Sequence, residues 1–200
     1  MNNKNVILIT IDSLRSDHIS CLGYFRKTTP NIDALADDGV LFSNAISNGP
    51  GTAESFPSIL TSTYPNMYGD YPHLSERRTT IAEVLKRNGY STAAFHSNPY
   101  LSSYYGYNKG FDTFEDFLDK SLDESFTTKI KHKIETTLTK NSTMYRILKM
   151  LISKVSRESL PYKRADVINQ KAISWIRNHP NRFFLWLHYI DVHYPYTPPK

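Results

Sequence analysis

The stretch NVILITID, residues 5–12, decides the fold class. Val6–Ile11 is an unbroken apolar and β-branched run that ends at an acid. A strand buried on both faces of a parallel sheet has such a run, whereas a half-exposed strand alternates apolar and polar residues. A second stretch, RFFLWLHYID at 182–191, repeats the pattern and also ends at an acid. We therefore expect two parallel strands that are covered by helices on both faces.

Helical and strand-like patterns alternate between these two strands. A short helix is expected at 31–38, followed by Gly39 and a strand at 40–45, and residues 165–177 again have helical periodicity. Strands that alternate with helices imply a parallel sheet with right-handed crossovers. The sequence therefore predicts an α/β fold with a doubly wound, mostly parallel sheet flanked by helices.

The clearest helix signals lie in TTIAEVLKRNGYSTAAF. Thr80 and Glu83 have the spacing of a capping box, in which each side chain hydrogen-bonds the other residue's backbone at the start of a helix. Gly89 suits the position just after a helix end, where a left-handed conformation is common. A strand is expected next, at 91–95.

The positive charge of the chain is local. The net charge is +5, but residues 129–164 carry ten Lys and Arg against two Asp and Glu, a net of +8 that leaves −3 for the remainder. This distribution indicates a basic helical insertion at about 121–160 and argues against a nucleic-acid-binding domain. One face of the insertion is apolar, with Tyr145, Leu148, Leu151, Ile152 and Val155. Such a face could lie on an anionic membrane surface, cover the sheet edge or dock on further sequence.

Composition excludes several other classes of protein. A single cysteine excludes an internal disulfide and a cysteine-based zinc site. The apolar run before Asp12 has six residues, too few for a signal-peptide core or a membrane span, so a cytoplasmic protein is expected. A nucleotide-binding domain is disfavoured because the Gly-Pro-Gly turn at 49–51 is not a glycine-rich phosphate loop.

Three polar positions follow predicted strands and should meet at one edge of the sheet. Asp12 ends the first strand, where a carboxylate could bind a hard metal ion or simply cap a helix. Thr52 follows the turn at 49–51, before a helix that can start within 55–62, and its hydroxyl could face a bound anion or serve as a helix cap. His193 follows the last strand and could donate to an anionic substrate. Ligands bind beyond the carboxyl ends of strands in open parallel sheets, so this convergence predicts a site.

Five stretches together resemble the N-terminal half of the sulfatases, a family of the alkaline phosphatase superfamily. They occur in the family's order and spacing: NVILITIDSLRSDHISCLGY, TTPNIDALADDGVLFSNAIS, GTAESFPSILTSTYPNMYG, TIAEVLKRNGYSTAAF and FFLWLHYIDVHYPYTPP. The resemblance implies a doubly wound α/β sandwich with a divalent metal at the carboxyl edge of the sheet. It also implies that residues 1–200 are the N-terminal part of a sulfatase-like catalytic domain whose C-terminal half, carrying an Asp-His pair, would be a partner.

The resemblance assigns roles to individual residues. Asp12 matches the family's first metal-binding acid, although the acid that often follows it is Ser13 here. Thr52 takes the place of the Cys or Ser that becomes formylglycine, and Phe56 takes the place of the motif's arginine, so no formylglycine is expected. The remaining matches concern substrate binding. Ser55 matches the family's serine, and His193 matches its substrate-contacting histidine. The family's lysine and histidine that bind the anion are replaced by Ser97 and Pro99, and His96 could partly take over their role.

This pattern is similar to the Thr-nucleophile branch of the superfamily, which includes phosphoglycerol transferases. The branch implies that Thr52 is the nucleophile, that Asp12 and Thr52 bind a divalent cation (Ca, Mg, Mn or Zn), and that the substrate is a sulfate or phosphate ester. A cation lowers the pKa of a bound hydroxyl, which makes a threonine usable near neutral pH. The alternative is a non-catalytic, truncated half-domain with a binding role or none.

Overall fold

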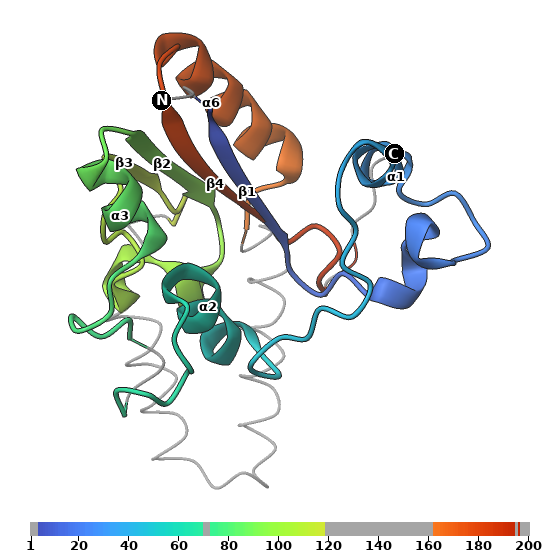
Figure 1. The fold of residues 1–200 in the computed structure, drawn as a ribbon, viewed down its shortest axis with the longest axis horizontal. Helices are drawn as coiled ribbons and strands as arrows, with labels where there is room; N and C mark the ends of the chain where they lie inside the picture. The colour runs from blue at the N-terminus through green and yellow to red at the C-terminus, as the bar shows by residue number, and fades with distance from the viewer. Residues whose placement is uncertain (1–3, 70–72, 119–161, 195, 197–200) are drawn as a thin grey trace, which may run out of the picture. The chain divides into compact units, whose positions relative to one another are not determined.

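The computed structural model describes residues 4–69, 73–118, 162–194 and 196. Its elements, in order, are β1 (Val6–Ile11), η1 (Ser16–His18), η2 (Ser20–Leu22), α1 (Pro30–Asp38), α2 (Thr52–Thr61), α3 (Ile81–Arg87), β2 (Ser91–His96), η3 (Pro99–Leu101), η4 (Ser103–Tyr105), β3 (Thr113–Glu115), α6 (Ala165–Asn178) and β4 (Phe183–Tyr189) (Figure 1). They belong to one unit, Met1–Asp116 with Arg164–Lys200, and Phe117–Lys163 forms a second unit. The predicted basic insertion at about 121–160 lies outside the described residues.

The four described strands form one parallel sheet in the order β1-β4-β2-β3. The two stretches that predicted the fold are neighbours in it, since Val6 pairs with Phe184 and Ile11 pairs with Tyr189. On its other side β4 pairs with β2. The prediction of an α/β fold with a mostly parallel sheet is confirmed.

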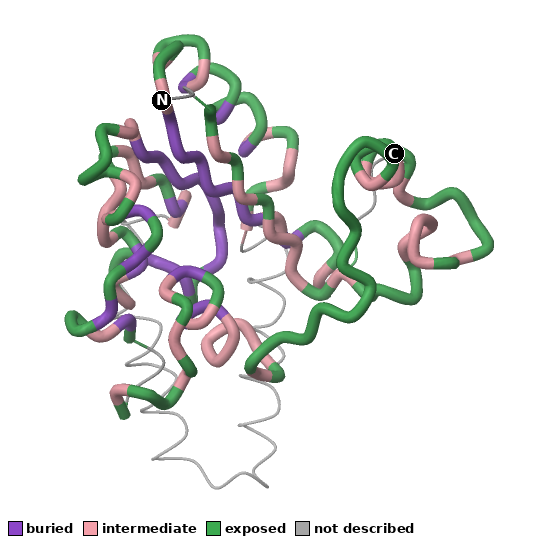
Figure 2. The backbone as a smooth tube through the Cα atoms, viewed as in Figure 1, coloured by how far each residue is buried: buried purple, intermediate pink, exposed green. Residues whose placement is uncertain are grey.

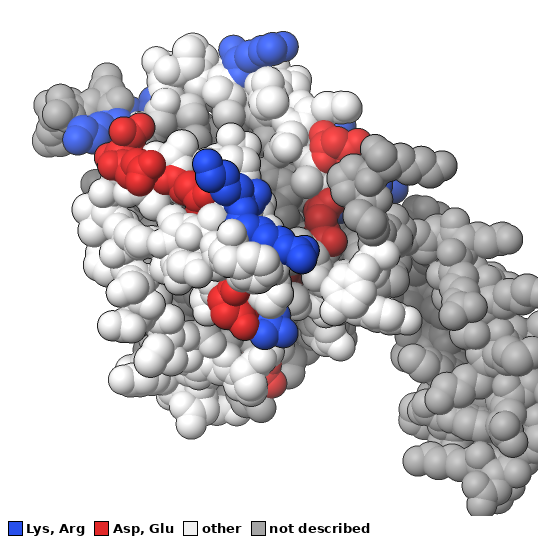
Figure 3. All heavy atoms as spheres, turned by 90° about the vertical axis from the view of Figure 1, so that its right-hand side faces the viewer, with Lys and Arg blue, Asp and Glu red and all other residues white. Residues whose placement is uncertain are grey.

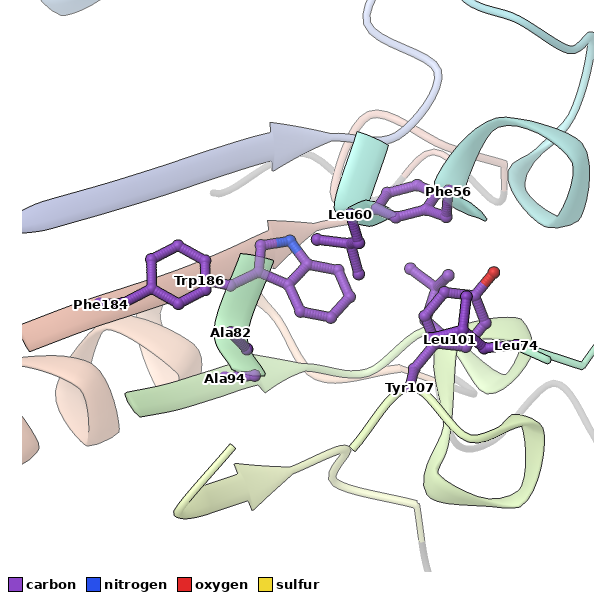
Figure 4. Close-up of a cluster of buried hydrophobic side chains, with 9 residues drawn as sticks. All are labelled: Phe56, Leu60, Leu74, Ala82, Ala94, Leu101, Tyr107, Phe184 and Trp186. Carbon is purple, nitrogen blue, oxygen red and sulfur yellow. The ribbon is translucent and has the colours of Figure 1, made fainter. Parts of the chain in front are cut away.

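Helices pack on both faces of β4, the central strand. Successive side chains of a strand point to opposite faces. Trp186 accordingly packs against Phe56 of α2, with ring centroids 5.7 Å apart, while Phe183 packs against Trp175 of α6 at 5.6 Å. The main core lies on the α2 side and contains Phe56, Leu60, Leu74, Ala82, Ala94, Leu101, Tyr107, Phe184 and Trp186 (Figure 4).

The prediction that the first strand is covered on both faces is wrong. β1 lies at the edge of the described sheet, and Ile7 and Ile9 are 51% and 50% exposed. In the tube of Figure 2, β1 has the colours of intermediate and exposed residues. Ile7 and Ile9 project on the α6 side, where α6 packs on β2 and β4. On the other face, Val6 and Leu8 are partly buried against the main core.

The predicted strand at 40–45 is also absent. These residues form an irregular segment, in which Val40 and Phe42 are about four-fifths exposed. A strand needs a neighbouring backbone to satisfy its N–H and C=O groups, and none of the four described strands pairs with this segment. The apolar side chains of this segment suit burial, but no described element covers them.

The start and end of α3 match the prediction in atomic detail. Thr80 Oγ1 accepts from the backbone N–H of Glu83 at 3.1 Å, and Glu83 Oε2 accepts from the backbone N–H of Thr80 at 2.9 Å. Gly89 follows the helix with φ at +80°, a conformation that side chains disfavour. The capping box and the glycine stop therefore set both ends of this short helix.

Charged groups of both signs are interspersed on the face drawn in Figure 3, and much of that described surface is uncharged. Among the described residues, none of the helices combines the length and the apolar character that crossing a membrane requires.

Candidate active site

A pocket of about 770 Å³ lies where the carboxyl ends of β1 and β4 meet the amino-terminal end of α2. Its lining comes from the end of β1, the Gly-Pro-Gly turn, α2, β4 and the loop after β4: Thr10, Ile11, Asp12, Ser13, Leu14, Ser47, Gly49, Pro50, Gly51, Thr52, Ser55, Phe56, Ile59, His188 and His193. The structure therefore brings Asp12, Thr52 and His193 to one pocket, at the edge where the sequence places them.

Thr52 is the first residue of α2, and a glycine-rich turn places it there. Gly51 precedes the helix in an extended conformation, and its carbonyl accepts from the backbone N–H of Ser55 at 3.0 Å. A Cβ added at Gly49 would lie 2.4 Å from Cβ of Glu54, so the turn can approach the helix this closely only with glycine there. The Thr52 hydroxyl thus lies beside helix-start N–H groups, which favour anions.

Several polar side chains of the site converge on the carboxylate of Asp12. Its Oδ2 atom accepts hydrogen bonds from Thr52 Oγ1 and Asn98 Nδ2, both at 3.0 Å, and its Oδ1 atom accepts from Ser13 Oγ at 3.0 Å. Nε2 of His188 lies 3.6 Å from Oδ2. Burial alone would raise the pKa of Asp12, but the polar contacts from His188, Ser13 and Thr52 outweigh burial and lower this pKa to about 2. Asp12 is therefore anionic at neutral pH.

Two polar residues of the site, His188 and Asn98, are not among the residues that the sequence predicts for it. Both side chains are almost fully buried, and both approach Asp12. His188 pairs in register with Thr10 on the core face of the sheet, one position before β4 ends. A histidine at an inward position of an otherwise apolar strand is a signal that could have identified it. Asn98 lies two residues after β2, at the same edge.

The other predicted substrate contacts differ in their placement. His193 lines the pocket, and its Nδ1 atom lies 2.6 Å from the Tyr194 carbonyl oxygen. Ser55 also lines it, but its hydroxyl donates to the Gly49 carbonyl at 2.9 Å and so serves the turn. His96 is fully buried among aromatic rings and does not line the pocket. The structure does not bring it to where a substrate would bind.

Oxygen atoms at the pocket could fill part of the coordination shell of a divalent cation. Asp12 supplies an ionised carboxylate and Thr52 supplies a hydroxyl, the oxygen ligands that hard cations prefer. Within the part of the chain that the structure describes, no group of three or more His, Cys, Asp or Glu side chains is placed to hold a metal ion. Asp12 and Thr52 would therefore supply two ligands to such a cation, and water, substrate or other groups would supply the rest.

Comparisons with known proteins identify the family of the chain. The family model described as Sulfatase matches residues 4–200. Iduronate 2-sulfatase of Mus musculus is 28% identical over 210 aligned positions, which cover 98% of this chain and 36% of that protein. The chain thus spans about a third of the length of this relative.

Solved structures with a similar fold cover nearly the whole chain. A protein crystallised with its substrate D-glucosamine-2-N,6-O-disulfate matches with a TM-score of 0.67 at 18% identity, over 98% of this chain and 36% of that one. The lipoteichoic acid synthase LtaP from Listeria monocytogenes matches with a TM-score of 0.60 at 20% identity, over 98% of this chain and 43% of that one. At these identities the likeness concerns the fold alone.

Proposed function

The chain belongs to the sulfatase family, and from this premise we propose that it cleaves or transfers a sulfate or phosphate ester with Thr52 as the nucleophile. One observation carries the proposal. Thr52 is the first residue of α2 and lines the pocket, and its Oγ1 atom donates to the ionised Asp12 at 3.0 Å. A hydroxyl in that position is accessible to a ligand, is oriented by a carboxylate and lies beside N–H groups that favour an anion.

Two displacements at phosphorus or sulfur would complete the reaction. In the first, Oγ of Thr52 forms a bond to the central atom while the ester bond to the substrate's alcohol breaks, and the alcohol departs with the proton that Thr52 gives up. In the second, water or an acceptor alcohol attacks the group held on Thr52 and regenerates the hydroxyl. The acceptor decides between hydrolysis and transfer.

A divalent cation is the cofactor that we propose for this site, held by Asp12 and Thr52. When bound, it would lower the pKa of the Thr52 hydroxyl and offset negative charge on the transferred group. The residues of this chain supply the orientation. Asp12 remains ionised because polar contacts outweigh its burial, and its Oδ2 atom fixes the direction of the Thr52 hydroxyl.

The relatives suggest which esters to test. Iduronate 2-sulfatase and the protein bound to a disulfated glucosamine point to a sulfated sugar, whereas the lipoteichoic acid synthase points to a polyol phosphate. We propose that His193, at the rim of the pocket, contacts the transferred anion or the adjoining alcohol. An imidazole can donate a hydrogen bond to either oxygen type.

The test is turnover of aryl sulfate and aryl phosphate esters by the purified protein with Mg²⁺, Mn²⁺, Ca²⁺ or Zn²⁺. Thr52→Ala should lower kcat/KM by on the order of 10³-fold or more, because the nucleophile is removed. Thr61→Ala is the matched control, since Thr61 lies at the other end of α2. Turnover that survives in Thr52→Ala would contradict the proposal, and ester binding without turnover in the unaltered protein would favour the non-catalytic alternative.

A further inference from the structure

We propose that the alcohol part of the ester is uncharged and apolar where it lies along α2, and that Ile59 is the residue that determines this specificity. This rests on the proposed function only in placing the anionic group of the ester at Thr52. The alcohol part is then held by apolar contacts along the helix and not by charged side chains.

One face of α2 forms a wall of the pocket. The residues of α2 that line the pocket recur at intervals of three and four positions, which places them on a single side of the helix: Thr52, Ser55, Phe56 and Ile59. At a rise of about 1.5 Å per residue, Ile59 lies about 10 Å along the helix axis from Thr52. A ligand whose anionic group lies at Thr52, and which extends along this wall, therefore meets Ile59 with its alcohol part.

Ile59 is the apolar side chain of this wall that is open to a ligand. Phe56 is 6% exposed and belongs to the core, and the Ser55 hydroxyl already donates to the Gly49 carbonyl at 2.9 Å. Ile59 is 42% exposed, whereas the next residue, Leu60, is 2% exposed. A ligand that covers apolar surface removes it from water, which favours binding. The wall therefore favours a group with hydrocarbon surface at Ile59.

Two other segments add apolar surface to the pocket. Ile11 and Leu14, at the end of β1 and just after it, line the pocket and are partly exposed, and Pro50 of the Gly-Pro-Gly turn lines it and is exposed. Pockets that bind small organic groups commonly combine such apolar surface with a few polar groups that fix the orientation. Here the polar groups lie at Thr52 and Asp12, where the ester's anionic group is placed.

The described lining of the pocket contains no Lys or Arg that could bind a second anionic group. Asp12 is its one carboxylate. The transferred anionic group faces the start of α2 and the proposed cation. A further sulfate, phosphate or carboxylate at the far end of the alcohol would face Ile59 instead and would be repelled by Asp12. The alcohol part that fits this lining is therefore uncharged.

Calorimetric titration with alkylphosphonates and alkylsulfonates tests the proposal without turnover, because a carbon replaces the ester oxygen. The ethyl, butyl and hexyl compounds are compared on the full-length protein with Mg²⁺ or Mn²⁺ present. Affinity should rise by about 2- to 4-fold for each added methylene, the range expected for burial of a methylene in a partly open pocket. 5-Carboxypentylphosphonate, in which a carboxylate replaces the terminal methyl of the hexyl compound, should bind at least about 10-fold more weakly than hexylphosphonate.

Two substitutions of Ile59 assign the effect to this residue. Ile59→Ser should lower the affinity for hexylphosphonate by about 5-fold or more and leave that for ethylphosphonate nearly unchanged, since the ethyl group does not reach Ile59. Ile59→Lys should raise the affinity for 5-carboxypentylphosphonate by about 2- to 5-fold. Ile173 is the matched control, because it is 49% exposed on α6 and does not line the pocket; Ile173→Ser and Ile173→Lys should leave every affinity unchanged.

Three results would overturn the proposal: no binding of any of these compounds, an affinity independent of chain length, or equal effects of the Ile59 and Ile173 substitutions. These results are separate from those that test the nucleophile. Chain-length-dependent binding that Ile59→Ser removes would support the specificity even if no ester were turned over. Turnover that Thr52→Ala abolishes, together with an affinity independent of chain length, would support the proposed function and contradict the specificity.

Discussion

The buried ring of His96 should make the protein lose stability as the pH falls below neutrality. The ring is enclosed by Phe114 and Trp186, with ring centroids 5.1 and 5.3 Å away, and its Nδ1 atom accepts from the backbone N–H of Asn98 at 3.3 Å. Nε2 is buried and has no hydrogen-bond partner among the described residues. Burial, and to a smaller extent the electrostatic interaction with the neighbouring His188, lowers the pKa of His96 from 6.5 to about 3.

The sign and size of the effect follow from this lowered pKa. Between pH 6.5 and about 3 the unfolded chain binds a proton at His96 that the folded protein does not bind, so the free energy of unfolding falls as the pH falls. The limiting slope is about 1.36 kcal/mol per pH unit. From pH 6.5 to pH 5.0, His96 alone should therefore lower the stability by about 1–2 kcal/mol, because protonation of the unfolded chain is incomplete at the upper end.

Urea unfolding at several pH values, with His96→Gln as the perturbation, measures this contribution. The variant should be less stable at pH 7 but should lose about 1–2 kcal/mol less than the unaltered protein between pH 6.5 and 5.0. Asn108→Ala is the control, since Asn108 is exposed and does not titrate, and it should leave the pH slope unchanged. Equal slopes in the His96 variant and the unaltered protein would refute the assignment of His96 as a neutral core residue.

Three further predictions concern single residues. Thr52 should not become formylglycine, because threonine lacks the primary carbon of Cys or Ser and Phe56 replaces the motif's arginine; peptide mass analysis showing an aldehyde at position 52 would contradict this. Thr80→Ala should lower the free energy of unfolding by about 1 kcal/mol through loss of the capping box of α3, measured by urea unfolding. Asp12→Asn should reduce the loss of stability between pH 4 and 2 by about 1–2 kcal/mol. The lowered pKa of Asp12 stabilises the folded protein above pH 3.8, the pKa in the unfolded chain, and this stabilisation is lost as the pH falls toward 2; unfolding of both proteins across this pH range measures the difference.

Strand and helix ends with a local chemical signal were predictable from the sequence. The apolar run Val6–Ile11, the capping box at Thr80 and the glycine stop at Gly89 each act over a few residues and appear as expected. The prediction of a strand at 40–45 was wrong, because an apolar pattern shows only that a segment suits burial, whereas a strand also requires a pairing partner. The position of β1 at the sheet edge likewise depends on strand order, which short-range patterns do not encode.

Site residues that lie just after an element or at its start could be predicted from the sequence. Whether a side chain points into the pocket or into the core could not. Asp12 and His193 follow β1 and β4, which end at one edge, Thr52 begins α2, and all three line the pocket. His96 also lies at the end of a strand, but its side chain points into the core, so its proposed contact with the substrate was not supported. Asn98 could not be identified from the sequence, because it contacts Asp12 and His188, which lie 86 and 90 positions away in the chain.

The ring at position 56 connects these observations. In the sulfatase resemblance an arginine occupies this position, but here Phe56 packs edge-on against His188, with ring centroids 5.0 Å apart, and against Trp186. A buried ring at that position supports the orientation of His188 from one side, while Asn98 and Thr10 hold its two nitrogens. The positive charge that an arginine would bring to an anionic substrate must then come from elsewhere. In the proposed mechanism the helix start at Thr52 and the cation supply it. Dependence of ester binding on the cation is therefore the property that most directly separates this site from an arginine-based one.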